Sequence, residues 1–126
     1  MKLVLDTTVF IDVLRGLENA VTFLRDAVEQ HHELWSVSVV RTEVLAGMRK
    51  GEEKATLALL DGVRWLDVTV ELADDAGDLA RRYLRSHRGV DTVDYLLGAG
   101  ALALEARMCT SNVRHFPMFE GLQPVY

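Results

Sequence analysis

Residues 2–10 read KLVLDTTVF, and they indicate the fold class more clearly than any other part of the chain. Its first part, Lys2–Leu5, is a short apolar run without alternation, which is typical of a strand buried on both faces in a parallel sheet. The run ends abruptly at Asp6, and two threonines follow. Asp and Thr often precede the first turn of a helix, so a helix is expected next. A buried strand that passes directly into a helix is the repeating unit of α/β proteins.

The rest of the chain continues this alternation. Helices are predicted over residues 9–15, 19–30, 39–48, 52–60, 70–86 and 92–106, and strands over residues 2–5, 34–37, 64–68, 107–110 and 123–125. The second helix is expected to present Val21, Leu24 and Val28 on one face. We therefore predict a single α/β domain over residues 1–126, with three layers in which helices flank a central parallel sheet of about four to five short strands.

Composition limits the possible functions. Of the 126 residues, 49% are apolar and 26% are charged, as in ordinary globular proteins. No apolar window reaches the roughly 20 residues that cross a membrane, and the N-terminus does not resemble a secretory signal, so a cytoplasmic protein is expected. The single Cys109 agrees with a reducing compartment. The net charge of −5 argues against a nucleic-acid coat protein, although acids gathered around a cation would reverse the local field.

Three acids occupy positions that suit a metal site. Glu43 and Asp94 each lie among apolar or small residues at helical spacing, so both carboxylates are expected to face inward. Asp6 follows a strand, and ligands of open parallel sheets bind at the carboxyl ends of strands. Three converging carboxylates would suit the hard ions Mg²⁺ or Mn²⁺, and the absence of His and Cys from this set disfavours zinc.

The same residues have structural explanations that the sequence leaves open. Asp6 could cap a helix, and the carboxylates of Glu43 and Asp94 could be satisfied by backbone amides or by an arginine. Caps are the simplest role for Thr8, Asn19, Ser38, and Asp91 or Thr92, and Thr69 opens the helix predicted over residues 70–86. A basic run comprises Arg81, Arg82, Arg85, His87 and Arg88. Such a run is usually a solvated helix face, and contact with phosphates is the alternative.

Three segments, taken together and in order, resemble the PIN-domain nucleases and, within them, the VapC toxins of bacterial toxin–antitoxin pairs. The first is LDTTVFID at residues 5–12, and the second is VRTEVLAG at residues 40–47. The third is VDYLLGAGA at residues 93–101, followed by CTSNVRHF at residues 109–116. The resemblance spans nearly the whole chain and implies the PIN fold, in which helices flank a central parallel sheet.

The resemblance also implies a site and an activity. It makes Asp6, Glu43 and Asp94 the acidic core, with Asp6 and Asp94 as direct ligands of Mg²⁺, or of Mn²⁺. Asn112 stands where many members have a fourth acid, and an amide brings no charge to a second metal. The accessory positions are Thr8, Asp91, Thr110 and Ser111. The implied activity is metal-dependent hydrolysis of RNA, whether transfer, ribosomal or messenger RNA.

The implied partners are a VapB-type antitoxin and a second copy of the chain, for which the helices at residues 9–15 and 52–60 are candidate contact surfaces.

Two rival functions use the same features. A phospho-acceptor receiver domain is also α/β with acids at strand ends, but it needs paired acids after the first strand and a lysine after a late strand, and neither occurs here. An inactive PIN-like module that only binds RNA or protein remains an alternative, and it would leave RNA intact in the presence of metal.

Overall fold

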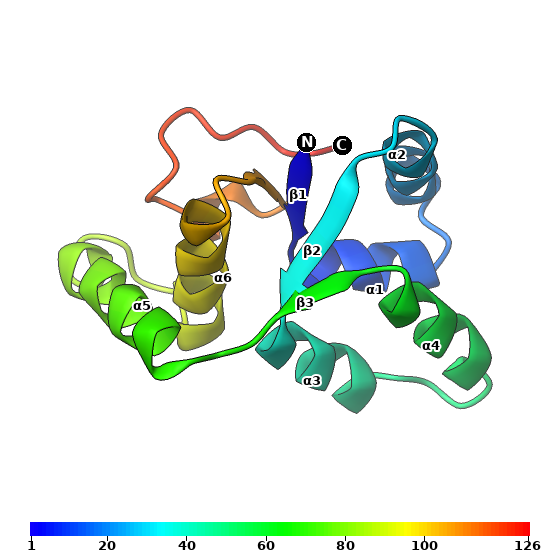
Figure 1. Cartoon of the computed structure of the whole chain (residues 1–126), viewed down its shortest axis with the longest axis horizontal. Helices are drawn as coiled ribbons and strands as arrows, with labels where there is room; N and C mark the ends of the chain where they lie inside the picture. The colour runs from blue at the N-terminus through cyan, green and yellow to red at the C-terminus, as the bar shows by residue number, and fades with distance from the viewer.

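The computed structural model describes residues 1–126 as alternating strands and helices (Figure 1). In chain order the elements are β1 (Lys2–Leu5), α1 (Thr7–Leu14), α2 (Glu18–Glu29), β2 (Glu33–Val37), α3 (Ser38–Ala46), α4 (Glu53–Asp61), β3 (Arg64–Leu66), α5 (Val70–Tyr83), α6 (Thr92–Ala103), β4 (Arg107–Cys109) and the 3-10 helix η1 (Val113–His115). None of the helices combines the length and the hydropathy that a membrane-spanning helix requires.

The sheet has four strands in the order β3-β2-β1-β4, and all neighbours are parallel. Val4 of β1 is paired with Trp35 on one side and Met108 on the other, and its side chain is fully buried. The apolar run at the start of the chain therefore forms an inner strand covered on both faces. The predicted α/β class and the predicted parallel sheet are confirmed.

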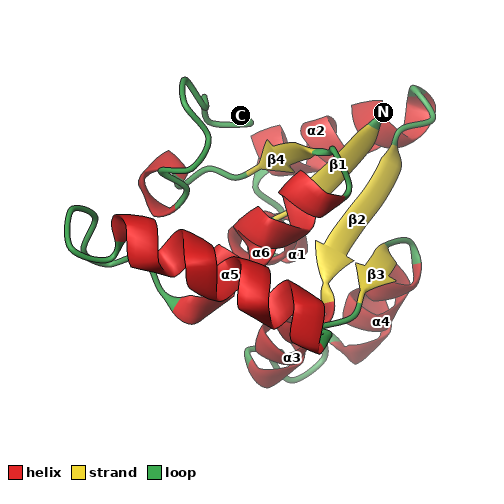
Figure 2. Ribbon diagram, turned by 60° about the vertical axis from the view of Figure 1, so that its left-hand side comes forward, coloured by secondary structure: helices red, strands yellow, loops and turns green.

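Helices cover both faces of the sheet. On one side α6 packs on β1, β2 and β4, and α5 packs on the outside of α6 (Figure 2). On the other side lie α1, α2, α3 and α4 (Figure 1). Close packing of α6 depends on Gly100, because a Cβ atom there would lie 2.8 Å from Cγ2 of Val37 in β2. The core between these layers includes Leu5, Phe10 and Leu97.

The carboxyl ends of three strands bring chain segments together. Asp6 follows β1, Ser38 begins α3 directly after β2, and Thr110 follows β4. Since the strands are parallel, these positions share one edge of the sheet. The candidate site is built at this edge.

The predicted last strand, at residues 123–125, is wrong. The chain after η1 contains no strand. Its only backbone hydrogen bond to the residue that follows β4 runs from Val125 N to Thr110 O, at 2.9 Å. Pro124 has no N–H group, so the segment cannot supply a regular ladder.

Several predicted helix caps are also wrong. The N-cap residues of α1, α2 and α3 are Asp6, Leu17 and Val37, and none of them makes a side-chain cap bond, so Thr8, Asn19 and Ser38 do not cap these helices. The buried face of α2 consists of Ala20 and Ala27, whereas the predicted Val28 is 56% exposed. Because these residues are small, α2 can lie close to its neighbours. The prediction relied on the large apolar residues of the helix and therefore chose a different face. The predicted cap Asp91 is confirmed, and Thr69, which was predicted to open the helix over residues 70–86, caps α5.

Candidate metal site at the carboxyl edge of the sheet

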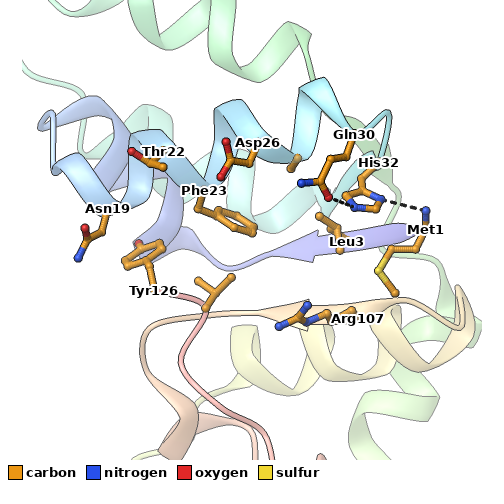
Figure 3. A pocket seen from close by; sticks show the side chains of 12 residues that line it. Met1, Leu3, Asn19, Thr22, Phe23, Asp26, Gln30, His32, Arg107 and Tyr126 are labelled. Atoms are coloured by element: carbon orange, nitrogen blue, oxygen red, sulfur yellow. Dashed lines mark hydrogen bonds between the residues drawn. The ribbon is translucent and has the colours of Figure 1, made fainter.

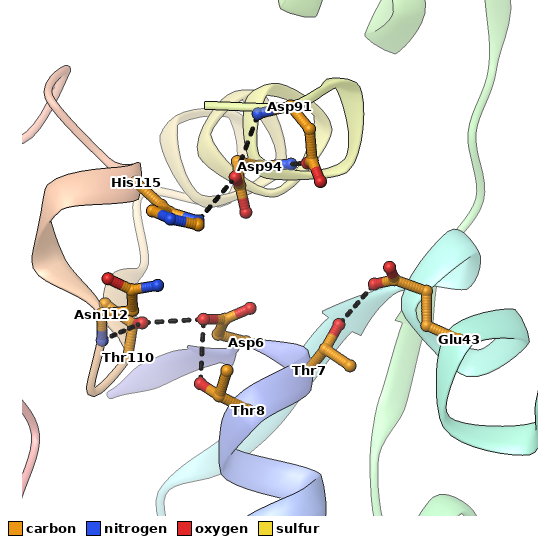
Figure 4. Close-up of polar contacts among 9 residues, drawn as sticks. All are labelled: Asp6, Thr7, Thr8, Glu43, Asp91, Asp94, Thr110, Asn112 and His115. Carbon is orange, nitrogen blue, oxygen red and sulfur yellow. Dashed lines mark hydrogen bonds and ion pairs between the residues drawn. The ribbon is translucent and has the colours of Figure 1, made fainter. Parts of the chain in front are cut away.

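Asp6 and Asp94 face each other across the carboxyl edge of the sheet (Figure 4). Asp6 lies between β1 and α1, and Asp94 lies in the first turn of α6. Each residue is only 6% exposed. The structure therefore brings together two of the three acids that the sequence singled out, although 88 positions separate them in the chain (94 minus 6).

The Asp6 carboxylate is held by hydroxyl groups. Thr110 Oγ1 donates to Oδ2 at 2.7 Å, and Thr8 Oγ1 donates to the same oxygen at 3.0 Å. Thr110 is fully buried, and its hydroxyl also accepts the backbone N–H of Asn112 at 2.9 Å. No lysine, arginine or histidine forms an ion pair with Asp6. The Asp6 side chain makes no cap bond to α1 either, so the alternative that this acid serves as a helix cap is excluded.

The Asp94 carboxylate is fixed by its own helix. Its Oδ2 atom accepts the backbone N–H of Asp91 at 3.2 Å, and the Asp91 side chain accepts the backbone N–H of Asp94 at 3.0 Å, which together form a capping box. His115 Nδ1 lies 3.0 Å from the same Oδ2. Asp91, one of the two cap residues predicted for this helix, therefore caps α6, and it also orients Asp94.

The pKa of Asp94 is raised from 3.8 to about 6. Burial is the largest cause, because it disfavours the charged carboxylate, and the negative charges of Asp91 and Asp6 raise the pKa further. The Asp91 backbone N–H and His115 lower it but do not compensate. The folded protein therefore holds an ionised Asp94 at a cost in free energy.

Glu43 is placed differently from the prediction. In α3 the buried residues are Val40 and Val44, and Glu43 is exposed, so the inward-facing orientation was wrong. Its Oε1 atom accepts a hydrogen bond of 2.6 Å from Thr7 Oγ1, which lies between Glu43 and Asp6 (Figure 4). No group of three or more His, Cys, Asp or Glu residues is arranged to hold a metal ion. The three acids do not form one cluster; Glu43 lies at the rim.

The remaining predicted residues line the side of the site formed by the chain after β4. Ser111 Oγ donates a long hydrogen bond of 3.5 Å to Thr8 Oγ1. Asn112 is half-buried and lies beside Thr110 and His115 (Figure 4). No role for His115 is predicted from the sequence, although this residue lies in the segment CTSNVRHF at residues 109–116. Its position depends on η1, which has no periodic signal in the sequence.

The free oxygens of the acid pair suit a hard cation. In both carboxylates the hydrogen bonds described above converge on Oδ2, and neither Oδ1 atom has a hydrogen-bond partner. These Oδ1 atoms are not among the fully buried polar atoms without partners, which are Thr56 Oγ1 and Tyr95 OH. Two accessible carboxylate oxygens with no ammonium or guanidinium partner are the donors that Mg²⁺ and Mn²⁺ prefer.

A separate cavity of about 470 Å³ lies at the opposite end of β1, between α2 and the two chain termini (Figure 3). Its walls include Phe23, Arg107 and Tyr126. None of the site residues described above lines this cavity, so it is separate from the acid pair.

Comparisons with known proteins agree with this architecture. The family model described as "PIN domain" matches residues 3–116. The chain is 47% identical over 126 residues to Ribonuclease VapC19 of Mycobacterium tuberculosis, covering 100% of both chains, and 38% identical over 125 residues to Ribonuclease VapC10 of the same organism, covering 98% of this chain and 92% of the relative. It also resembles the solved structure of VapBC-1 from nontypeable Haemophilus influenzae, with a TM-score of 0.77 and 21% identity over 99% of this chain and 98% of that chain. The chain therefore belongs to the PIN-domain family and, within it, to the VapC group.

Proposed function

We propose that this chain is a divalent-metal-dependent endoribonuclease that hydrolyses RNA phosphodiester bonds and is the toxin of a type II toxin–antitoxin pair. The full-length similarity to proteins named as VapC ribonucleases carries this proposal. The buried pair of Asp6 and Asp94, which lacks a lysine or arginine partner, supports it. The partners that we propose are a VapB-type antitoxin, an RNA substrate and a second copy of the chain.

Asp6 and Asp94 would hold the cation, with Mg²⁺ as the first candidate and Mn²⁺ as the second. Bound there, it would offset the repulsion of the two carboxylates, activate water and stabilise negative charge on a phosphodiester. Thr110 and Thr8 keep the Asp6 carboxylate in place, and Asp91 does the same for Asp94. These bonds fix the pair before any ligand arrives, so little reorganisation is needed on binding.

The rim residues complete the proposed mechanism. Glu43 is exposed and can accept a proton from the attacking water, either directly or through another water molecule. The Asn112 amide and the Ser111 hydroxyl carry no charge and can donate hydrogen bonds to a phosphate oxygen.

The test is cleavage of RNA by the purified chain after removal of the antitoxin. Wild type should cut total RNA in Mg²⁺ or Mn²⁺ and not in a chelator, whereas Asp6→Asn and Asp94→Asn should leave it intact. The matched control is Asp26→Asn, an identical chemical change at an exposed position in α2. Undiminished cleavage by both site variants would refute the assignment. A wild type that binds RNA without cutting it would instead support the alternative of an inactive PIN-like module.

A further inference from the structure

The basic run at residues 81–88, which we call the basic segment, spans the end of α5 and the connection that leads to α6. All its basic side chains are exposed, and none of them forms an ion pair: Arg81, Arg82, Arg85, His87 and Arg88. No Asp or Glu occurs between Asp78 and Asp91. The basic segment is therefore a local concentration of positive charge in a chain whose net charge is −5.

Two of its arginines have a structural explanation, and two do not. Arg81 and Arg82 lie in the last turn of α5, where positive charge interacts favourably with the helix dipole. This effect fades beyond the last turn, and Arg85 and Arg88 follow the C-cap residue Leu84. Arg85 and Arg88 are therefore exposed cations that no interaction within the chain accounts for.

The connection that carries these two arginines has a defined course. The backbone N–H of His87 donates to Tyr83 O at 2.8 Å, so the chain turns directly after α5. Gly89 has a φ of +89°, a left-handed conformation that favours glycine, and Val90 is buried in the core. The fold thus fixes the connection at both ends, between α5 and α6 (Figure 1).

The basic segment leads directly into the residues of the candidate metal site. Arg88 is three residues before Asp91, so their Cα atoms are at most about 11 Å apart, because each residue of extended chain spans at most about 3.6 Å. The Asp91 side chain accepts the backbone N–H of Asp94, one of the two proposed metal ligands. A strand of RNA held at Asp94 would therefore pass close to Arg88.

The edge of the sheet where RNA would be cut is itself acidic. Asp6 and Asp94 lie there with Asp91 (Figure 4). A divalent cation between Asp6 and Asp94 offsets charge at the cleaved phosphate only, so the neighbouring phosphates need cations from elsewhere. Guanidinium groups suit them, because their planar N–H donors match the oxygens of a phosphate. The basic segment carries such groups next to the site.

We propose that Arg85 and Arg88 form a phosphate-binding site for the RNA strand beside the cleaved bond. They hold the RNA backbone and so position it relative to Asp6 and Asp94, without reading its sequence. Proximity to the metal site favours RNA over an acidic protein segment, which is the rival occupant. The inference rests on the proposed function, because it takes RNA as the substrate. Binding and cleavage are therefore tested separately, so that the two proposals can fail separately.

Binding of a labelled single-stranded RNA in a chelator, at several salt concentrations, tests the contacts without cleavage. For a single strand, each lost phosphate contact reduces the slope of log K against log salt concentration by about 0.7. Arg85→Ala and Arg88→Ala should each show this reduction, and the double variant about twice as much, equally on RNAs of different sequence. Arg25→Ala is the matched control and should bind as wild type does, because Arg25 is exposed and unpaired in α2, near the amino ends of the strands (Figure 1).

Steady-state cleavage with Mg²⁺ or Mn²⁺ gives a second readout. Each alanine variant should raise KM roughly fivefold with little change in kcat, because neither arginine touches the reacting phosphate. Arg88→Lys keeps the charge and should recover most of the loss at that position, which a structural role of the guanidinium would not predict. Both positions are exposed, so Tm should change by less than about 2 °C.

The two proposals give distinguishable failures. If wild type cuts RNA and the double variant has the wild-type KM and the wild-type salt slope, the inference is overturned while the nuclease stands, and an acidic protein becomes the candidate ligand of the basic segment. If wild type binds RNA through Arg85 and Arg88 but does not cut it, the phosphate-binding site is supported and the nuclease proposal fails.

Discussion

Replacing Asp94 by asparagine should stabilise the metal-free protein while abolishing RNA cleavage. Asparagine has nearly the same size, and its oxygen can still accept the Asp91 backbone N–H, so the capping box is kept. What disappears is the charge. Because burial, Asp91 and Asp6 all disfavour that charge, its removal relieves a destabilising interaction in the folded state.

The magnitude follows from the pKa of Asp94. The rise from 3.8 to about 6 corresponds, at about 1.4 kcal/mol per unit, to about 3 kcal/mol at neutral pH. Because the asparagine amide is also polar and must itself be buried, the expected net gain in the free energy of unfolding is about 1 to 3 kcal/mol. For a chain of this length 1 kcal/mol shifts Tm by roughly 4 °C, so Asp94→Asn should melt roughly 4 to 12 °C higher.

The gain has a defined pH dependence. A carboxyl whose pKa is higher in the folded state costs nothing at a pH well below 3.8, where both states are protonated. The cost develops as the pH rises toward 6 and is constant above it. The difference in stability between Asp94→Asn and wild type should therefore be small near pH 4, about half developed near pH 5, and complete at pH 7.5.

The assay is thermal unfolding of both proteins at several pH values in a chelator, and again with Mg²⁺ or Mn²⁺. Ions that bind the folded state add stability, by about 2.7 kcal/mol at a hundredfold excess over Kd, and only wild type should gain it. Asp26→Asn is the control for a charge change on the surface. If Asp94→Asn melts at or below the wild-type Tm at pH 7.5 without metal, Asp94 is already compensated by its own fold and the reasoning fails.

Other contacts at the site give further predictions. Thr110→Val removes the buried hydroxyl that donates to Asp6, so it should lower the free energy of unfolding by about 2 to 3 kcal/mol and reduce cleavage. Thr110→Ser keeps the hydroxyl and should retain most of the stability and most of the cleavage activity. Glu43→Gln keeps an acceptor for Thr7 at an exposed position, so urea unfolding should change by less than about 0.5 kcal/mol while cleavage falls; unchanged cleavage would remove Glu43 from the mechanism. Tyr126→Phe removes the hydroxyl that donates to Asp12 at 2.6 Å and should cost about 1 to 2 kcal/mol in the same unfolding measurement, and an unchanged midpoint would contradict the contact.

The strands and most helices could be predicted from the sequence because their signals are local. Lys2–Leu5 is apolar at nearly every position, which a strand buried on both faces requires, and the structure covers it on both faces. The strand predicted at residues 123–125 failed because Val125 packs against the core as part of an irregular segment. Short apolar runs near the end of a chain do not distinguish these two cases.

The site was predicted in part, and the errors have a physical cause. The position of Asp6 could be predicted because the carboxyl ends of parallel strands share one edge of the sheet. The inward orientation of Asp94 could be predicted because its neighbours at helical spacing are apolar or small. Glu43 failed because α3 is short and its buried face is only Val40 and Val44. The neighbours of Glu43 at helical spacing are also apolar, but which side of such a helix faces solvent depends on the position of α3 on the sheet. His115 depends likewise on how the chain after β4 folds back.

The acid pair is held by the framework of the fold rather than by a ligand. The pairing of Leu5 with Cys109 sets Asp6 beside Thr110, and Thr110 fixes the Asp6 carboxylate. The close contact of Gly100 with β2 sets the position of α6, whose first turn carries Asp94. Neither constraint involves the other carboxylate, so the fold can hold the two negative charges together against their repulsion. That repulsion contributes to the raised pKa of Asp94, and it is also what a bound cation would relieve, so the same arrangement destabilises the empty site and favours metal binding.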